Sequence, residues 1–174
     1  RWSVLEAGSE INGFYAAAHA RSAAELEAGF AQWYRAPAQN MLAADRSGHI
    51  AIRSTGRYPI RAHNGSIALD GTSSANDWTG DLPVRKWPQA FDPAQGFLAS
   101  ANQQPVDPRA VDFWFGGSYD PWRALRINAL LRADSAVTVD DMRRFQTDPG
   151  SARADVYVPY FLNAALRVAQ RSSG

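Results

Sequence analysis

The chain has no cysteine among its 174 residues, so it forms no disulfide bond and carries out no thiolate chemistry. It also lacks an apolar run near the roughly 20 residues that a membrane-spanning helix needs. Neither sign of charge is in excess, because the chain has 18 basic and 17 acidic residues. A nucleic acid or an anionic membrane would require a strongly basic face, so we expect neither as a partner.

Long polar tracts and internal repeats are absent as well, and 45% of the residues are apolar. This composition is typical of a globular domain, and the length allows a sizeable buried core. Arg1 is not an initiator methionine, and no signal-like apolar stretch follows it. We therefore expect any export signal to lie upstream, in a longer precursor.

Local patterns in the first third predict a helix and then a β-hairpin. Ser22-Ala-Ala-Glu25 is a capping-box pattern, and large apolar residues follow it at helical spacing, namely Leu26, Phe30 and Trp33. Further along, Asp45-Arg-Ser-Gly48 separates two short apolar segments. Aspartate starts turns and glycine accepts the positive φ that a bulged hairpin turn needs, so a hairpin is expected here.

The later segments predict one more strand and then helices. The apolar segment Gly96–Ser100 suits a buried strand that ends at Asn102, and Asp120-Pro121 suits a helix start. Thr138-Val-Asp-Asp141 opens another helix, and an amphipathic helix is expected after Pro159. The class is therefore α+β, mixed at first and helical afterwards.

The softest boundary falls at Gly116-Gly117-Ser118, where two glycines and a serine follow one another. It divides the chain into residues 1–117 and 118–174. His19, His49 and His63 are scattered and have no spacing of a zinc site or a charge relay. Neither a GxSxG nucleophile elbow nor a phosphate-binding loop is present.

Asn102 stands out for its chemistry. A lone asparagine after a strand is more often a structural residue, in a turn or satisfying backbone groups. A side-chain amide is nevertheless a neutral donor that stabilises a developing oxyanion without titrating, and one such donor is worth about 3 to 4 kcal/mol.

The context of Asn102 resembles the penicillin acylase family of N-terminal nucleophile hydrolases. The first likeness is the segment GFLASANQQP, from Gly96 to Pro105. An upstream segment resembles the hairpin of the same family at Asn40, Ala44, Asp45, Gly48, Ile50, Gly56, Pro59 and Arg61. Between the two, the likeness continues at Asp77-Trp78-Thr79-Gly80, Pro83, Pro88 and Asp92-Pro93. It covers nearly the whole chain, and the order and spacing of the motifs make it specific.

The resemblance implies part of an αββα sandwich followed by a mostly helical region. It implies an amidohydrolase that cleaves a linear N-acyl amide through an N-terminal serine. Since this chain opens with Arg1-Trp2, it is expected to be an internal piece of the large (beta) chain and inactive alone. The implied partners are an N-acyl amide substrate, the small (alpha) chain and the remaining large-chain segments. The parent is expected to be a self-cleaving precursor, periplasmic or secreted.

By resemblance, Asn102 binds the oxyanion and Arg123 orients Asn102. Arg126 competes for the second role, and both arginines are otherwise explained as solvated or paired with Asp120. Gln39 takes the place of a residue that lines the acyl pocket. No metal or cofactor site is expected in this chain; the parent is compatible with a structural calcium, for which only Asp112 is a candidate ligand here, and a hard cation needs about six oxygens.

Two alternatives stay open. One keeps the fold and changes the substrate, as in an acyl-homoserine lactone or lipopeptide acylase that prefers long acyl chains. The other is a non-catalytic binding or structural module that has kept the scaffold and lost the serine.

Overall fold

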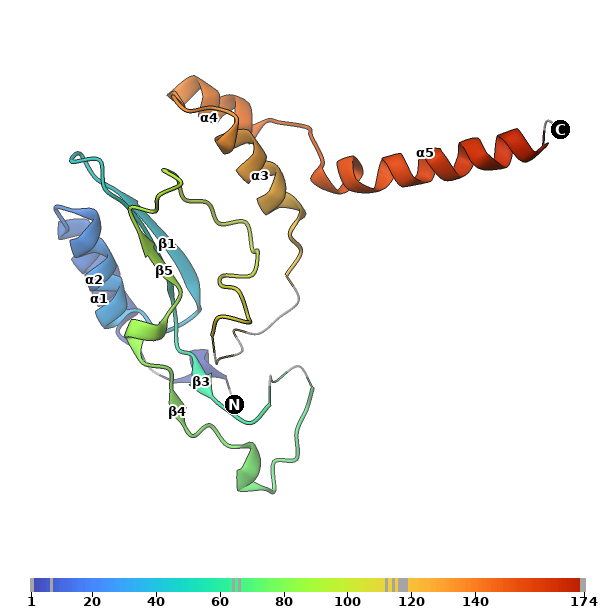
Figure 1. Cartoon of the computed structure of the whole chain (residues 1–174). Coiled ribbons are helices and arrows are strands. Elements are labelled where there is room, and N and C mark those ends of the chain that lie inside the picture. Colours follow the sequence, from blue (N-terminus) through green and yellow to red (C-terminus); the bar gives the residue numbers. More distant parts are fainter. Residues whose placement is uncertain are drawn as a thin grey trace. The chain divides into compact units, whose positions relative to one another are not determined.

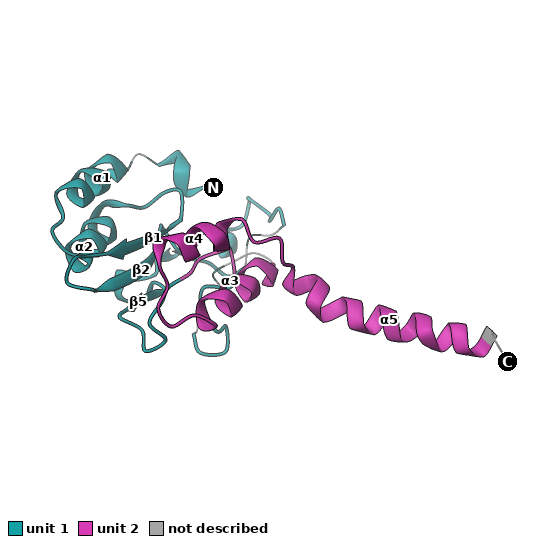
Figure 2. Cartoon of the chain, turned by 90° about the horizontal axis from the view of Figure 1, so that it is seen from above, with its two compact units in different colours: residues 1–98, 104–118 teal, residues 99–103, 119–174 magenta. Residues whose placement is uncertain are grey.

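The computed structural model describes residues 2–6, 8–63, 65, 67–111, 113, 115 and 119–172. The chain divides into two compact units (Figure 2): unit 1 comprises residues 1–98 and 104–118, and unit 2 comprises residues 99–103 and 119–174. The boundary predicted at Gly116-Gly117-Ser118 lies outside the described residues. Asn102, which the predicted division placed in its first part, belongs to unit 2.

Unit 1 begins with the helices α1 (Glu10–His19) and α2 (Ala23–Trp33), which pack against each other. The predicted cap of α2 is present, because the Ser22 hydroxyl accepts the Glu25 N–H at 3.1 Å. The two helices approach closely at Gly29, where a Cβ atom would lie 2.9 Å from that of Ala16. A glycine at this crossing therefore lets the helix backbones come together.

The β-layer of unit 1 is a three-stranded antiparallel sheet in the order β1-β2-β5 (Figure 1). Its strands are β1 (Gln39–Ala44), β2 (Ile50–Thr55) and β5 (Gln89–Phe91). The predicted hairpin is confirmed, and Gly48 in its turn has a φ of 90°. Because α2 contacts β1 and β2, unit 1 contains one α-layer against one β-layer. This accords with part of the αββα sandwich that the family resemblance implies.

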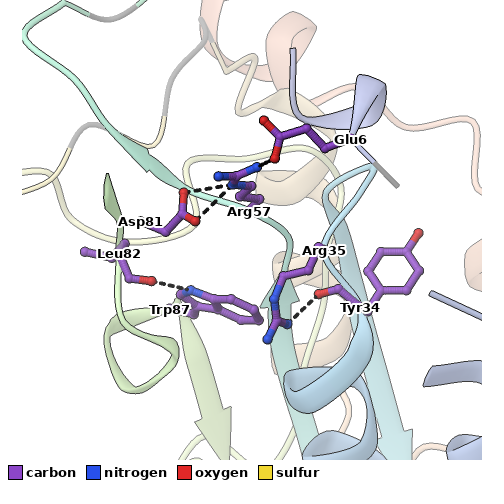
Figure 3. A network of polar contacts seen from close by, with 7 residues as sticks. All are labelled: Glu6, Tyr34, Arg35, Arg57, Asp81, Leu82 and Trp87. Carbon is purple, nitrogen blue, oxygen red and sulfur yellow. Dashed lines mark hydrogen bonds and ion pairs between the residues drawn. The ribbon is translucent and has the colours of Figure 1, made fainter. Parts of the chain in front are cut away.

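Short elements complete unit 1 on either side of an irregular connection. They are the 3-10 turns Ser3–Leu5, Ser74–Asn76 and Val84–Lys86 and the paired strands β3 (Pro59–Ile60) and β4 (Gly80–Asp81). Arg57 joins two of these parts, since its guanidinium pairs with Glu6 and with both oxygens of Asp81, at 3.0 and 2.9 Å (Figure 3).

Trp87 is one of the residues drawn in Figure 3, and only 4% of its surface is exposed. Its indole N–H donates to the Leu82 carbonyl oxygen at 3.1 Å. The Tyr58 ring packs edge-on, with the two ring centres 5.7 Å apart, and the Arg35 guanidinium lies 5.3 Å from the indole centre. The buried indole thus has a partner for its one polar atom, as buried tryptophans usually do.

A buried ion pair joins α2 to β2. Arg53 Nη2 donates to Glu27 Oε2 at 3.4 Å, and the two side chains are only 13% and 10% exposed. Within the described part of the chain, Glu27 Oε1 and Arg53 Nε have no hydrogen-bond partner. Burial raises the pKa of Glu27 above its usual value, although the neighbouring Arg53 opposes that shift. Desolvation therefore outweighs the attraction at this pair.

A second polar cluster ties the hairpin to β5. Asp92 accepts the His49 ring N–H at 2.6 Å and the Ile50 backbone N–H at 2.9 Å. Asp45 accepts the backbone N–H of Ala23 at 3.1 Å, so it also holds the first turn of α2. The hydrogen bond to Asp92 raises the pKa of His49 above its usual value.

We expect this cluster to make stability depend on pH. The folded pKa of His49 exceeds the unfolded value, so its contribution is complete below about 6.5 and is lost as pH rises through the folded pKa. An NMR titration of the imidazole should give a midpoint above 6.5, and Asp92→Asn should lower it. A wild-type midpoint at or below 6.5 would contradict the expectation.

Unit 2 contains the helices α3 (Trp122–Arg132), α4 (Val139–Gln146) and α5 (Ala152–Ser172). The predicted helix start at Thr138 is confirmed, and the structure shows a capping box there: Thr138 Oγ1 accepts the Asp141 N–H, and the Asp141 carboxylate accepts the Thr138 N–H. No helix in the described part of the chain is long and apolar enough to cross a bilayer.

Two element predictions are wrong. The final helix begins at Ala152, and Pro159 lies inside it instead of before it, because helical hydrogen bonds already form upstream of the proline, where the Asp155 N–H donates to the Ser151 carbonyl oxygen at 2.9 Å. Gly96–Ser100 forms no strand. Side-chain amides form hydrogen bonds with the backbone of this segment instead. The Gln95 amide donates to the Phe97 carbonyl oxygen at 2.9 Å, and the Gln103 amide donates to the Ala99 carbonyl oxygen at 3.0 Å.

Candidate oxyanion site

Asn102 occupies a tight turn of unit 2 with a φ of 60°. Asparagine adopts this left-handed conformation more readily than most residues do. Gln103 brackets the turn, because its side-chain amide accepts the Ala101 N–H at 2.7 Å and donates to the Ala99 carbonyl. Ala101 is 4% exposed, whereas the side chain of Asn102 is exposed. The buried neighbour and the bracketing amide therefore hold an exposed asparagine in a defined position.

Arg123 meets Asn102 from the first turn of α3. That turn begins beside Asp120, whose carboxylate accepts the Trp122 N–H at 3.2 Å. Arg123 Nη2 donates to Asn102 Oδ1 with a separation of 2.5 Å. The structure thus brings together two residues that are 21 positions apart in the sequence and that were both predicted to belong to the site.

The contact with Arg123 fixes the orientation of the Asn102 side-chain amide. A guanidinium has only donors, so the atom that faces it must be the amide oxygen. The amide nitrogen then points away with both of its N–H groups, and within the described residues it makes no hydrogen bond. The side chain therefore presents a neutral, fixed donor, which is the polarity that an oxyanion requires.

Arg126 does not share the contact with Asn102. It forms a two-pronged pair with Asp148, in which Nε and Nη2 each donate to a carboxylate oxygen at 2.7 Å. Neither arginine is paired with Asp120 within the described residues. The geometry thus separates the two candidates: Arg123 lies at Asn102, and Arg126 connects α3 to the segment before α5.

Gln39 lies in unit 1, at the exposed first position of β1. It is paired with Thr55 of β2, whose hydroxyl donates to the Gln39 carbonyl oxygen at 2.9 Å. Its assignment to the acyl pocket remains a prediction, because Gln39 and Asn102 belong to different units.

The described residues do not fit a metal ion by themselves. Nowhere among them do three or more histidine or acidic side chains gather in a suitable group. Asp112, the candidate ligand of a calcium in the parent, lies outside the described residues. No step of the chemistry below depends on a metal.

The sequence of the chain matches the model of the penicillin amidase family over residues 1–173. The chain belongs to the penicillin amidase family. This membership agrees with the resemblance noted from the motifs around Asn40 and Asn102, and the α+β architecture agrees with it as well.

Two relatives of this chain are named as different kinds of acylase, a penicillin acylase and an acyl-homoserine lactone acylase. Penicillin acylase 2 proenzyme of Pseudomonas sp. (strain SE83) is 32% identical over 110 residues, or 63% of this chain and 14% of that protein. Acyl-homoserine lactone acylase QuiP of Pseudomonas aeruginosa is 32% identical over 149 residues, or 84% of this chain and 17% of that protein. The chain thus spans less than a fifth of the length of these relatives.

Among solved structures, a thermostable penicillin G acylase from Alcaligenes faecalis is similar in fold. The TM-score is 0.63 at 22% sequence identity, and the match covers 79% of this chain and 25% of that one. The similarity supports the N-terminal nucleophile hydrolase fold for the elements described above.

Two features of the site were not foreseen from the sequence. One is Gln103, which holds the turn of Asn102; its only signal was its place directly after that asparagine. The other is Asp148 as the partner of Arg126, 22 positions away. No local pattern relates these two residues, since the contact depends on how α3 packs.

Proposed function

We propose that this chain supplies the oxyanion-binding part of an N-acyl amidohydrolase of the penicillin acylase type. The observation that carries the proposal is the contact between Arg123 and Asn102, which directs the amide N–H groups of Asn102 outward. A fixed neutral donor suits a reaction in which a carbonyl oxygen becomes negatively charged. Family membership makes acyl transfer the reaction for which such a donor would serve.

The reaction would begin with a serine at the N-terminus of the mature catalytic chain, a residue outside this 174-residue sequence. Its own α-amine acts as the general base, since the unperturbed pKa of about 7.7 to 8.0 lies near neutral pH. The serine oxygen attacks the acyl carbon, and Asn102 donates to the tetrahedral oxyanion. The amine of the substrate then leaves with a proton, and water releases the acyl group from the serine.

The proposal includes partners and a location. The remaining segments of a precursor, including a small chain, would supply the nucleophile and most of the acyl pocket. Gln39 would line that pocket from the first position of β1. We place the mature enzyme in the periplasm or outside the cell, by analogy with the family alone.

A second candidate function keeps this mechanism and changes the acyl group. The acyl-homoserine lactone acylase of P. aeruginosa matches 84% of this chain, more than the penicillin acylase 2 proenzyme does. Under this alternative the amine released is a homoserine lactone, and long acyl chains are preferred over phenylacetyl groups.

Intact mass and N-terminal sequencing of the protein purified from its native host test the proposal. We expect a chain that begins with serine and contains this sequence, together with a second, smaller chain. A panel of phenylacetyl amides and long-chain acyl-homoserine lactones then distinguishes the two candidate functions. A single uncleaved polypeptide that hydrolyses neither substrate would favour a non-catalytic module on the same scaffold.

A further inference from the structure

Helix α3 carries two arginines on one face, one turn apart, and each is anchored differently. Arg123 holds Asn102, and Arg126 makes the two-pronged pair with Asp148 in the connection between α4 and α5. The side chains of Arg126 and Asp148 are only 32% and 17% exposed. Such a fork-to-carboxylate pair fixes direction as well as distance, because two parallel hydrogen bonds must be satisfied together.

Most of the apolar side chains of α3, such as Trp122, Ile127 and Leu130, are half-buried. Ala124 is its only buried residue, and the ring of Trp122 contacts Tyr157 of α5 edge-on at 5.6 Å between centres. A cavity of about 260 Å³ adjoins the helix and is lined by Arg123, Arg126 and Asp148, among others. The two-pronged ion pair therefore adds a directional contact to a helix whose apolar packing is partial.

Residues in the connection between α4 and α5 also support the pair of Arg126 with Asp148. Asp148 also accepts the Gly150 N–H at 3.1 Å. A Cβ atom at Gly150 would lie only 2.3 Å from the Cζ atom of Arg126, so only a glycine leaves the guanidinium its present place. The hydrogen bonds to Arg126 hold the pKa of Asp148 below its usual value, as expected for a carboxylate that accepts from a guanidinium.

We propose that Arg126, Asp148 and Gly150 form a positioning device for the oxyanion site, which sets the rotation of α3 and thereby places Arg123 against Asn102. This inference rests on the proposed function. Arg126 touches no reacting atom and acts only through Arg123. A displacement of about 1 Å at a catalytic group can cost on the order of 100-fold in rate, so a loose α3 would lower turnover without harming the fold.

Gly150→Ala is the sharpest variant, because it displaces the flexible end of Arg126 without changing any charge. In the complete enzyme we expect Gly150→Ala and Asp148→Asn to lower kcat by about 10- to 100-fold and to change KM by less than about 3-fold. Arg126→Lys, which keeps the charge and loses the fork, should do the same. Two controls should leave kcat unchanged: Gly71→Ala, where a Cβ meets open space, and Arg143→Gln, in an exposed ion pair with Asp140.

A double-mutant cycle separates positioning from a general structural role. If Gly150 acts through Arg123, then Gly150→Ala should have less than about a 2-fold effect on kcat once Arg123 is alanine. The same 10- to 100-fold loss in both backgrounds would overturn the proposal. So would a loss of kcat that follows only the amount of folded enzyme.

A crystal structure of the Asp148→Asn enzyme keeps this inference separate from the proposed function. We expect the Arg123–Asn102 hydrogen bond to be broken or lengthened there, and an unchanged contact would overturn the inference. If Asn102→Gly leaves turnover intact while the contact is lost in the Asp148→Asn crystal, the proposed function fails, but the finding that Asp148 and Arg126 place Arg123 against Asn102 stands.

Discussion

Replacing Asn102 by glycine should lower kcat of the complete enzyme by about 100- to 1,000-fold, which corresponds to about 2.7 to 4 kcal/mol of transition-state stabilisation. The amide N–H groups of Asn102 point away from Arg123. Under the proposed function they act only when the carbonyl oxygen becomes charged. KM should therefore change little, because a donor that acts in the transition state affects kcat and kcat/KM alike. Steady-state kinetics on a chromogenic phenylacetyl amide measures both constants.

Glycine is the better substitution at this position because Asn102 has a φ of 60°. Alanine would remove the amide and also strain the backbone by about 1 to 2 kcal/mol, so that the two effects would be confused. Asn102→Asp keeps the shape and the acceptor for Arg123 but has no N–H donor and adds a negative charge. We expect it to be at least as inactive as Asn102→Gly. Turnover within 3-fold of the wild type in the glycine variant would remove Asn102 from the mechanism.

Removing one partner of the buried Glu27–Arg53 pair should destabilise the fold strongly. Arg53→Met leaves the carboxylate of Glu27 charged and 10% exposed, and an uncompensated buried charge costs about 3 to 5 kcal/mol. Urea unfolding of the 174-residue chain, followed by tryptophan fluorescence, measures the loss. The double variant Arg53→Met with Glu27→Leu should recover most of it, since an apolar pair of similar size is often neutral or stabilising.

The pH dependence of the Arg53→Met variant provides an internal check. The pKa of Glu27 is already raised by burial and should rise further without Arg53. A raised folded pKa favours the protonated carboxyl, so the variant should regain stability as pH falls through that value. An Arg53→Met chain that is as stable as the wild type at pH 8 would show that the pair is solvated and not buried.

Local patterns predicted those parts of the fold whose interactions are local. The Ser22 cap, the helix start at Thr138 and the hairpin turn at Gly48 each depend on residues within a few positions of one another. The segment at residues 96–100 was predicted wrongly because its apolar run suits a strand, whereas side-chain amides satisfy its backbone instead. The spacing of apolar residues indicates which side chains are buried, but it does not indicate which group forms a hydrogen bond with each backbone N–H or carbonyl.

The candidate site shows the same division between sequence and structure. The motif around Asn102 was sufficient to name that residue and to expect an oxyanion donor. It favoured Arg123 as the residue that orients Asn102 and left Arg126 as a competitor, because both stand on the same helix and either could reach a neighbour. The structure separates them by pairing Arg126 with Asp148.

The sequence alone determined the family, the α+β class, the hairpin and the identity of the candidate donor, since ordered motifs and local turn chemistry are written along the chain. Only the tertiary structure decided which arginine holds Asn102, that Gln103 brackets its turn, and that a buried ion pair joins α2 to β2. Each of these contacts links side chains whose positions follow from helix packing and chain reversal, and no spacing along the sequence encodes such a distance.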